Sequence, residues 1–262
     1  MKCRAAALLL AVCALLCCGC ENASSPDPET YGMLSDLVSA VGSEQRFCTD
    51  FLMETTFLDP STGKSHVLYF LDGRASCDRE EKRAFQDFKA TVLGASYHGC
   101  EYLSENGRVR LQDGQTTPFV QEVGQALTAF PYSAVTLPPI DSVRSLVSSD
   151  TPDGSYTLVW SEGQKELIED VWQVDLYSMA RIVLPDRTKE KFGDVTCILA
   201  VKDGALASVT WTLSATIYET PAYTPGYTPK DEDSRLDLSI RVKLTFVSFG
   251  NDVEIPVYEE NT

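Results

Sequence analysis

The sequence has few of the residues and motifs that build an enzyme site or bind nucleic acid. Histidine occurs only twice, at His66 and His98, and no HExxH, G-x-S-x-G or P-loop motif is present. Lysine and arginine number 22 against 38 aspartates and glutamates, a formal net charge of −16. Such a chain repels nucleic acid and anionic membrane surfaces. We therefore expect no catalytic residues and no nucleic-acid partner, although a Ser-His-Asp triad needs no local motif and stays open.

The sequence also lacks the cysteine and histidine spacing of a metal site. No Cys-x-x-Cys pair or Cys/His cluster occurs, so we expect no bound metal and no cofactor. Five of the nine cysteines lie at or before Cys20, which leaves Cys48, Cys77, Cys100 and Cys197. Four cysteines allow three disulfide pairings, and the sequence does not select one. Buried free thiols are an equally good interpretation.

Long hydrophobic runs are missing as well, apart from a short one near the start. Residues 5–16 form an apolar run of about 12 residues, preceded by Lys2 and Arg4. A bilayer core of ~30 Å needs ~20 such residues, so this run is too short to span it. A positive start, a short apolar run and small residues are typical of an export signal. No run of 18 or more apolar residues follows Cys20, and we expect the rest of the chain to be soluble.

The end of that run reads Leu15-Leu16-Cys17-Cys18-Gly19-Cys20 and resembles the lipobox of bacterial lipoproteins. The resemblance implies a signal peptide over 1–19, a diacylated Cys20 and a polar tether over 20–28. The protein would then be held by its lipid at the extracytoplasmic face of the bacterial cell membrane. Two acyl chains anchor stably where one binds marginally. The lipobox leucine comes one residue early, which leaves Cys18 as an alternative site, and an ordinary cleaved signal peptide is the other interpretation.

An amphipathic helix is expected directly after the tether. Asp27 can cap it, Pro28 suits its first position, and Gly42 can end it. Apolar residues recur between these limits at helical spacing. In the middle of the chain, similar spacing predicts a helix from Thr117-Pro118 to residue 130, a short helix over 140–147 and another after Ser161.

The rest of the chain is dominated by the alternation of apolar and polar residues that predicts antiparallel strands. The expected strands span residues 46–58, 64–72, 84–93, 97–103, 108–111, 156–160, 195–201, 208–217 and 235–246. The turns at 105–107 and 202–204 each end in glycine and predict hairpins. A proline-rich repeat over 220–229 predicts an extended loop between the last two strands.

This order of elements behind a lipobox resembles the lipoprotein-carrier superfamily of open half-barrels, which includes the LppX and LprG type lipoproteins. The closing stretch 244–256 and the hairpin around 200–206 are similar to the same regions of those families. The resemblance implies an α+β fold in which a large curved antiparallel sheet, an open half-barrel, wraps around a few helices. It would cover residues 29–262 as a single domain.

The resemblance also implies a non-enzymatic protein that holds a lipid or another hydrophobic ligand between sheet and helices. The lining would come from the apolar strand faces, at Phe51, Met53, Phe57, Trp211, Leu213, Leu238, Ile240 and Val242. Every half-buried sheet has such faces, however. The alternative is a module that binds another protein of the cell envelope and has a solid core without a ligand cavity.

Overall fold

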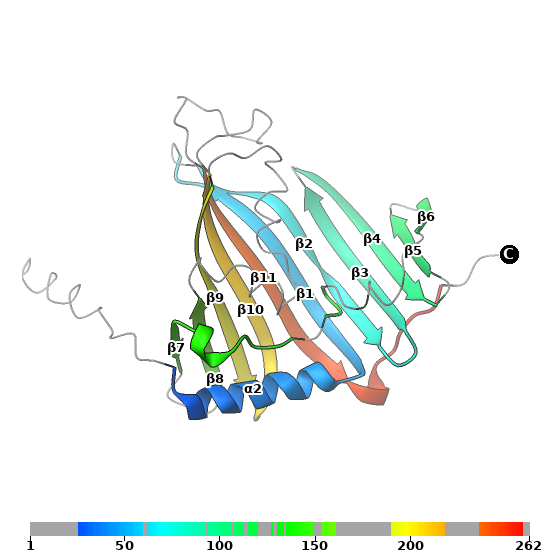
Figure 1. Ribbon diagram of the computed structural model, residues 1–262. Helices are drawn as coiled ribbons and strands as arrows, with labels where there is room; N and C mark the ends of the chain where they lie inside the picture. Colours follow the sequence, from blue (N-terminus) through cyan, green and yellow to red (C-terminus); the bar gives the residue numbers. More distant parts are fainter. Residues whose placement is uncertain are drawn as a thin grey trace, which may run out of the picture.

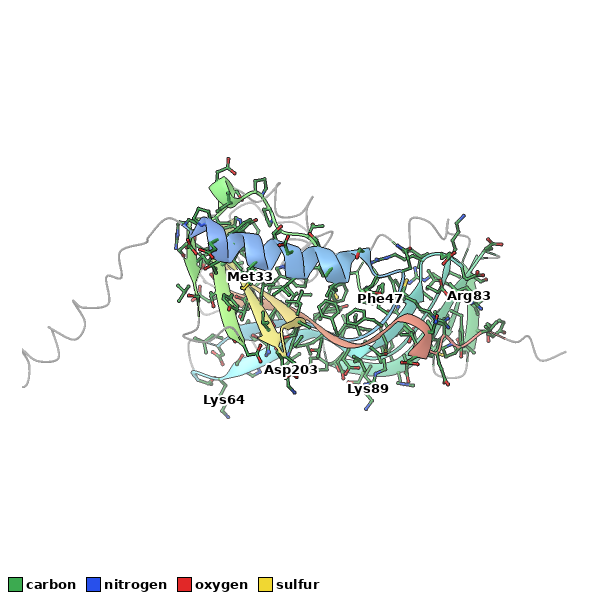
Figure 2. All side chains as sticks on the ribbon, turned by 90° about the horizontal axis from the view of Figure 1, so that it is seen from below. Met33, Phe47, Lys64, Arg83, Lys89 and Asp203 are labelled. Atoms are coloured by element: carbon green, nitrogen blue, oxygen red, sulfur yellow. The ribbon has the colours of Figure 1, made fainter. Side chains whose placement is uncertain are left out.

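The protein is built on one open antiparallel sheet of eleven strands, in the order β6-β5-β4-β3-β2-β1-β11-β10-β9-β8-β7. The computed structural model describes residues 26–59, 62–92, 94–105, 107–112, 115–119, 127, 130–133, 135–148, 153–160, 190–217 and 236–258. Figure 1 shows the strands side by side, and Figure 2 shows the sheet curving beneath a helix. The predicted fold class, a curved open half-barrel, is confirmed.

Nine of the eleven strands lie where alternation predicts them, and β6 and β7 are not predicted as strands. Their bounds are β1 (Arg46–Leu58), β2 (Ser65–Asp78), β3 (Arg83–Val92), β4 (Ala95–Ser104), β5 (Gly107–Gln112), β6 (Gln115–Phe119), β7 (Ser145–Val147), β8 (Gly154–Trp160), β9 (Glu190–Lys202), β10 (Ala205–Ile217) and β11 (Leu236–Phe249). β1 pairs with β11 along almost its whole length. The first and last strands of the chain therefore lie side by side near the centre of the sheet. The curvature gives the sheet a concave and a convex face.

Helix α2 (Pro28–Ser43) lies on the concave face, across one end of the strands (Figures 1 and 2). The Asp27 carboxylate caps it, because it accepts hydrogen bonds from the Thr30 backbone N (2.9 Å) and Oγ1 (2.6 Å). Tyr31, Leu34 and Val38 form its buried side. The predicted helix is confirmed, with its end one residue beyond Gly42.

The concave face holds the hydrophobic core. Strand pairing places one residue from each of the nine strands from β7 to β4 in a continuous row across the sheet: Leu146, Leu158, Cys197, Trp211, Val242, Met53, Leu71, Ala90 and Tyr97. Side chains opposite each other on neighbouring strands share a face and contact each other. The convex face is more polar, and Figure 2 shows Lys64 and Lys89 pointing away from α2.

Of the helix predictions from the middle of the chain, the start of one and the whole of another are wrong, whereas Leu127 of the first is helical as predicted. Residues 117–119 are extended in β6, where Pro118 lies opposite Val109. An edge strand tolerates proline, since one side of its backbone needs no ladder partner. In place of a helix over 140–147, a single 3₁₀ turn, η1 (Ile140–Ser142), leads into β7, whose Leu146 lies opposite Leu158.

Other predictions concern residues outside the described ranges. These are the signal peptide, Cys20 and its alternative Cys18, the helix after Ser161, the loop over 220–229, and residues 120–126 and 128–129 of the helix expected after Pro118. Within the ranges that are described, no helix is both long and apolar enough to cross a bilayer.

The four cysteines of the described part are all free thiols. Cys77 and Cys197 lie on the concave face in the core, whereas Cys48 and Cys100 lie on the convex face. Burial raises the pKa of the Cys77 thiol to about 12 and raises the pKa of Cys197 still further. The sequence left disulfides and free thiols as alternatives, and the structure shows free thiols.

Candidate ligand surface on the concave face

The eight residues predicted to line a ligand site all lie on the concave face. Strand register brings them together, with Met53 and Trp211 each opposite Val242. Seven of them are buried in the core: Phe51, Phe57, Trp211, Leu213, Leu238, Ile240 and Val242. These seven belong to the same hydrophobic cluster as the buried residues of α2. Only Met53 is half-buried, and the ligand-binding role of all eight stays a prediction.

A more accessible apolar surface lies beside them, on β1, β2 and β4. Met53, Tyr69, Leu71 and Tyr97 are half-buried and pack on the edge of the core, and we call them the concave patch. Leu71 lies opposite Met53 on one side and Ala90 on the other, and Ala90 lies opposite Tyr97. Tyr69 shares the face of Leu71 two residues away. The alternation over 64–72 places Tyr69 and Leu71 on one face, although neither is among the eight predicted lining residues.

Two glycines shape the face next to the patch. A Cβ on Gly73 would lie 2.9 Å from Phe51 Cζ and 2.1 Å from the Asp87 carbonyl oxygen, and one on Gly99 would lie 3.0 Å from Phe88 Cζ. The rings of Phe51 and Phe88 therefore lie across neighbouring strands in the space that the glycines leave. The Phe88 ring meets Tyr97 edge to face, with centroids 6.3 Å apart. The apolar surface thus continues from the concave patch toward β5.

Near β5, the buried carboxylate of Glu101 accepts hydrogen bonds from three side chains. Glu101 is 1% exposed, and it accepts hydrogen bonds from Gln86 Nε2 (2.9 Å), from Arg108 Nε (2.8 Å) and from Arg110. Gln86 and Arg110 lie directly opposite Glu101 on β3 and β5. We call these four residues the Glu101 cluster. Hydrogen bonds between charged groups are the stronger kind, so the cluster holds both guanidiniums in place.

The Glu101 cluster lies next to the concave patch. The Arg110 guanidinium is 5.9 Å from the centroid of the Phe88 ring. Burial raises the pKa of Tyr69, the neighbouring Tyr97 raises it further, and the positive charge of Arg110 opposes both. Tyr69, Tyr97 and Arg110 are therefore electrostatic neighbours. The cluster could not be predicted from the sequence, because nothing distinguishes Glu101 from the other acidic residues before the strands are paired.

A tyrosine hydroxyl is buried near the same cluster. Tyr132 is 3% exposed, and its Oη has no hydrogen-bond partner among the residues that the structure describes. Burial raises its pKa well above the ordinary value, and the charge of Glu101 raises it further. Arg79 fixes this region by donating to the carbonyl oxygens of Tyr132 (3.0 Å), Gly42 (3.0 Å) and Glu44 (2.8 Å). The end of α2, the turn after β2 and residues 130–133 are thereby held together.

A separate cavity of about 680 Å³ opens at the C-terminal end of α2. It is polar, with Arg46, Asp78 and Arg83 among its lining residues. Arg46 Nε and Arg83 Nη2 lie 3.9 and 3.7 Å from the buried Asp78 carboxylate. Charged groups of both signs do not suit an acyl chain. Among the residues that the structure describes, no group of His, Cys, Asp and Glu side chains is placed to hold a metal ion.

The two histidines lie on opposite faces of the sheet. His66 is opposite Phe57 on the concave face and stacks on its ring, with centroids 4.9 Å apart. His98 is on the convex face, 2.6 Å from Asp87. They therefore cannot belong to one site. The expectation that the protein is not an enzyme stays a prediction.

Comparison with known proteins gives no assignment of family. No family model matches the sequence, and no curated protein matches it. Among solved structures, the chain is similar to a DUF1329 family protein from Desulfovibrio piger ATCC 29098. The identity is 8%, the TM-score is 0.27, and the match covers 87% of this chain and 95% of that chain. A similarity of this size carries no conclusion about function.

Proposed function

We propose that this protein is a membrane-anchored, non-enzymatic lipoprotein that binds a lipid or another hydrophobic ligand at the extracytoplasmic face of the cell membrane. The lipid on Cys20 would anchor it, as the lipobox-like sequence suggests. The observation that carries the ligand proposal is the concave patch, a contiguous set of half-buried apolar side chains on the inner face of an open sheet.

The patch is a better candidate for ligand contact than the seven buried lining residues. A ligand among the seven buried residues would have to displace packed side chains, whereas Met53, Tyr69, Leu71 and Tyr97 still have area to cover. Each methylene removed from water contributes ~0.8 kcal/mol. A chain of ten methylenes on the patch would therefore gain on the order of 8 kcal/mol, before the cost of immobilising it.

The second candidate function is a protein-binding envelope module with a solid core. The burial of seven of the eight predicted lining residues favours it. The two functions differ in what the concave patch does, since a solid module needs no small hydrophobic ligand there.

Native mass spectrometry of residues 23–262, exported from a bacterial cell, separates the two functions. The ligand proposal predicts a mass above that of the chain, which disappears after extraction with organic solvent. A chain that shows only its own mass, and that also fails to bind a fluorescent fatty acid, would contradict it. That result would favour the protein-binding module.

A further inference from the structure

Two arginines line the cavity at the C-terminal end of α2 with hydrogen-bond donors left over. The Nε atoms of Arg46 and Arg83 are both buried, and neither has a hydrogen-bond acceptor among the residues that the structure describes. Each arginine forms an ion pair with Asp78, but Oδ2 of Asp78 lies 3.9 Å from Arg46 Nε and 3.7 Å from Arg83 Nη2, too far for a hydrogen bond. A buried charged donor without an acceptor is unfavourable, so a ligand oxygen that accepted from these groups would be stabilised there.

The turn after β2 explains why Asp78 does not satisfy these donors. Asp78 lies opposite Arg46 on β1 and opposite Arg83 on β3, so the three side chains share a face. Its Oδ1 accepts a hydrogen bond from the Glu81 backbone N at 3.0 Å, which ties the carboxylate to the turn. Asp78 therefore attracts the two guanidiniums by its charge, while its hydrogen bond goes to the turn.

The charge of the cavity changes sign from its interior to its edge. Asp78 is buried and Arg46 and Arg83 are half-buried, and these three side chains together carry one net positive charge. Glu80 and Glu81 also line the cavity but are exposed, and they carry two negative charges. The interior therefore favours an anionic group and the edge a cationic one. The cavity volume of about 680 Å³ lies within the range of roughly 300–1,000 Å³ that is usual for small-molecule sites.

We propose that this cavity binds a small zwitterion of the amino-acid or short-peptide class. Its carboxylate would accept hydrogen bonds from Arg46 and Arg83, because a guanidinium matches the geometry of a carboxylate. Its ammonium group would pair with Glu80 and Glu81 at the edge of the cavity. The inference goes beyond the proposed function, since none of the residues that line the cavity belongs to the concave patch.

Arg74 provides a matched control outside the cavity. It lies opposite Asp50 on the same pair of strands, and its Nε and Nη2 donate to that carboxylate at 2.7 and 3.1 Å. A position opposite an aspartate on β1 and β2 therefore does not by itself keep an arginine from bonding it. Arg74→Gln removes the same charge as Arg46→Gln but leaves the lining of the cavity unchanged.

Isothermal titration calorimetry with three dipeptide probes tests the proposal on the full chain carrying Cys20→Ala, which removes the chain's own lipid. The probes are L-alanyl-L-alanine, its N-acetyl derivative and its C-terminal amide, which share their side chains and are a zwitterion, an anion and a cation. We expect the zwitterion to bind at least about ten-fold more tightly than either derivative, since hydrogen bonds to charged groups are the stronger ones. Arg46→Gln and Arg83→Gln should each weaken its binding by a similar factor, and Arg74→Gln should not.

Each outcome supports or overturns a stated part of the proposal. Equal binding of the amide would overturn recognition of the carboxylate by the arginines, and equal binding of the N-acetyl derivative would overturn recognition of the ammonium group. No binding of the dipeptide would overturn the site and leave the hydrophobic-ligand proposal as it stands. If the glutamine variants fail to fold, the comparison of the three probes on the parent chain still decides.

Discussion

The close packing of the concave face can be tested at Gly73, which lies in the middle of β2. A Cβ there would meet Asp87 O at 2.1 Å, and Phe51 Cζ and Phe88 Cα at 2.9 Å. The first and third of these atoms belong to the backbone of β3, so they can move only by separating paired strands. Overpacking of this kind costs about 1–3 kcal/mol or more. We expect Gly73→Ala to lower the unfolding free energy by about 3 kcal/mol.

Urea unfolding and thermal melting of the exported chain would measure this change. For a chain of this size, 3 kcal/mol corresponds to a Tm lower by roughly 6–12 °C. Gly32→Ala is the matched control, because a Cβ at this position in α2 meets no atom within 4 Å. It should raise stability by about 0.5–1 kcal/mol, as alanine replaces glycine inside a helix. If Gly73→Ala were as stable as the parent, the reasoning about ring packing over the glycines would be refuted.

Three further predictions concern the buried carboxylate, the buried thiols and the anchor. Glu101→Gln should lower the unfolding free energy by about 1–3 kcal/mol in urea unfolding, because it leaves two partly buried guanidiniums without their anion. Asp50→Asn is the control, and it should change the unfolding free energy by less than about 1 kcal/mol, because its pair with Arg74 is about half exposed. If Glu101→Gln and Asp50→Asn lowered the unfolding free energy equally, this would contradict the burial of Glu101. The unfolded chain loses the Cys77 proton near pH 9, but the folded chain keeps it until about pH 12, so the unfolding free energy should fall as the pH rises above 9, by up to about 1.4 kcal/mol per unit. Cys77→Ala should reduce that slope, and an unchanged slope would count against the pKa assignment. Cys20→Ala should move the protein from the membrane fraction to the medium, and a chain that stays bound would rule out lipidation at Cys20.

The sequence predicts elements well where the local signal is long. Asp27 and Pro28 mark the start of α2, and the alternation over 208–217 and 235–246 continues for enough residues to exclude a helical period. The edge strands are different. β7 has three residues and β6 contains Pro118, so their extended conformation depends on pairing with β8 and β5 rather than on their own pattern.

The candidate site was only partly predictable for a similar reason. Alternation places Phe51, Met53 and Phe57 on one face, and the structure agrees. Which part of that face stays accessible depends on which segments pack against it in the folded chain, and this is not a local property. The Glu101 cluster is formed by three strands, so its charges come together only once β3, β4 and β5 are in register.

Photolabelling with a diazirine-containing fatty acid tests the central claim most directly, because it reports both binding and position. We predict saturable adducts on the concave patch, in peptides that contain Met53, Tyr69, Leu71 or Tyr97, and competition by unlabelled fatty acid. Leu52, one residue from Met53 but opposite Lys243 and Asp72 on the convex face, should stay unlabelled. Labelling that does not saturate, or that falls on Leu52 and the convex face, would contradict a ligand surface on the concave side of the sheet.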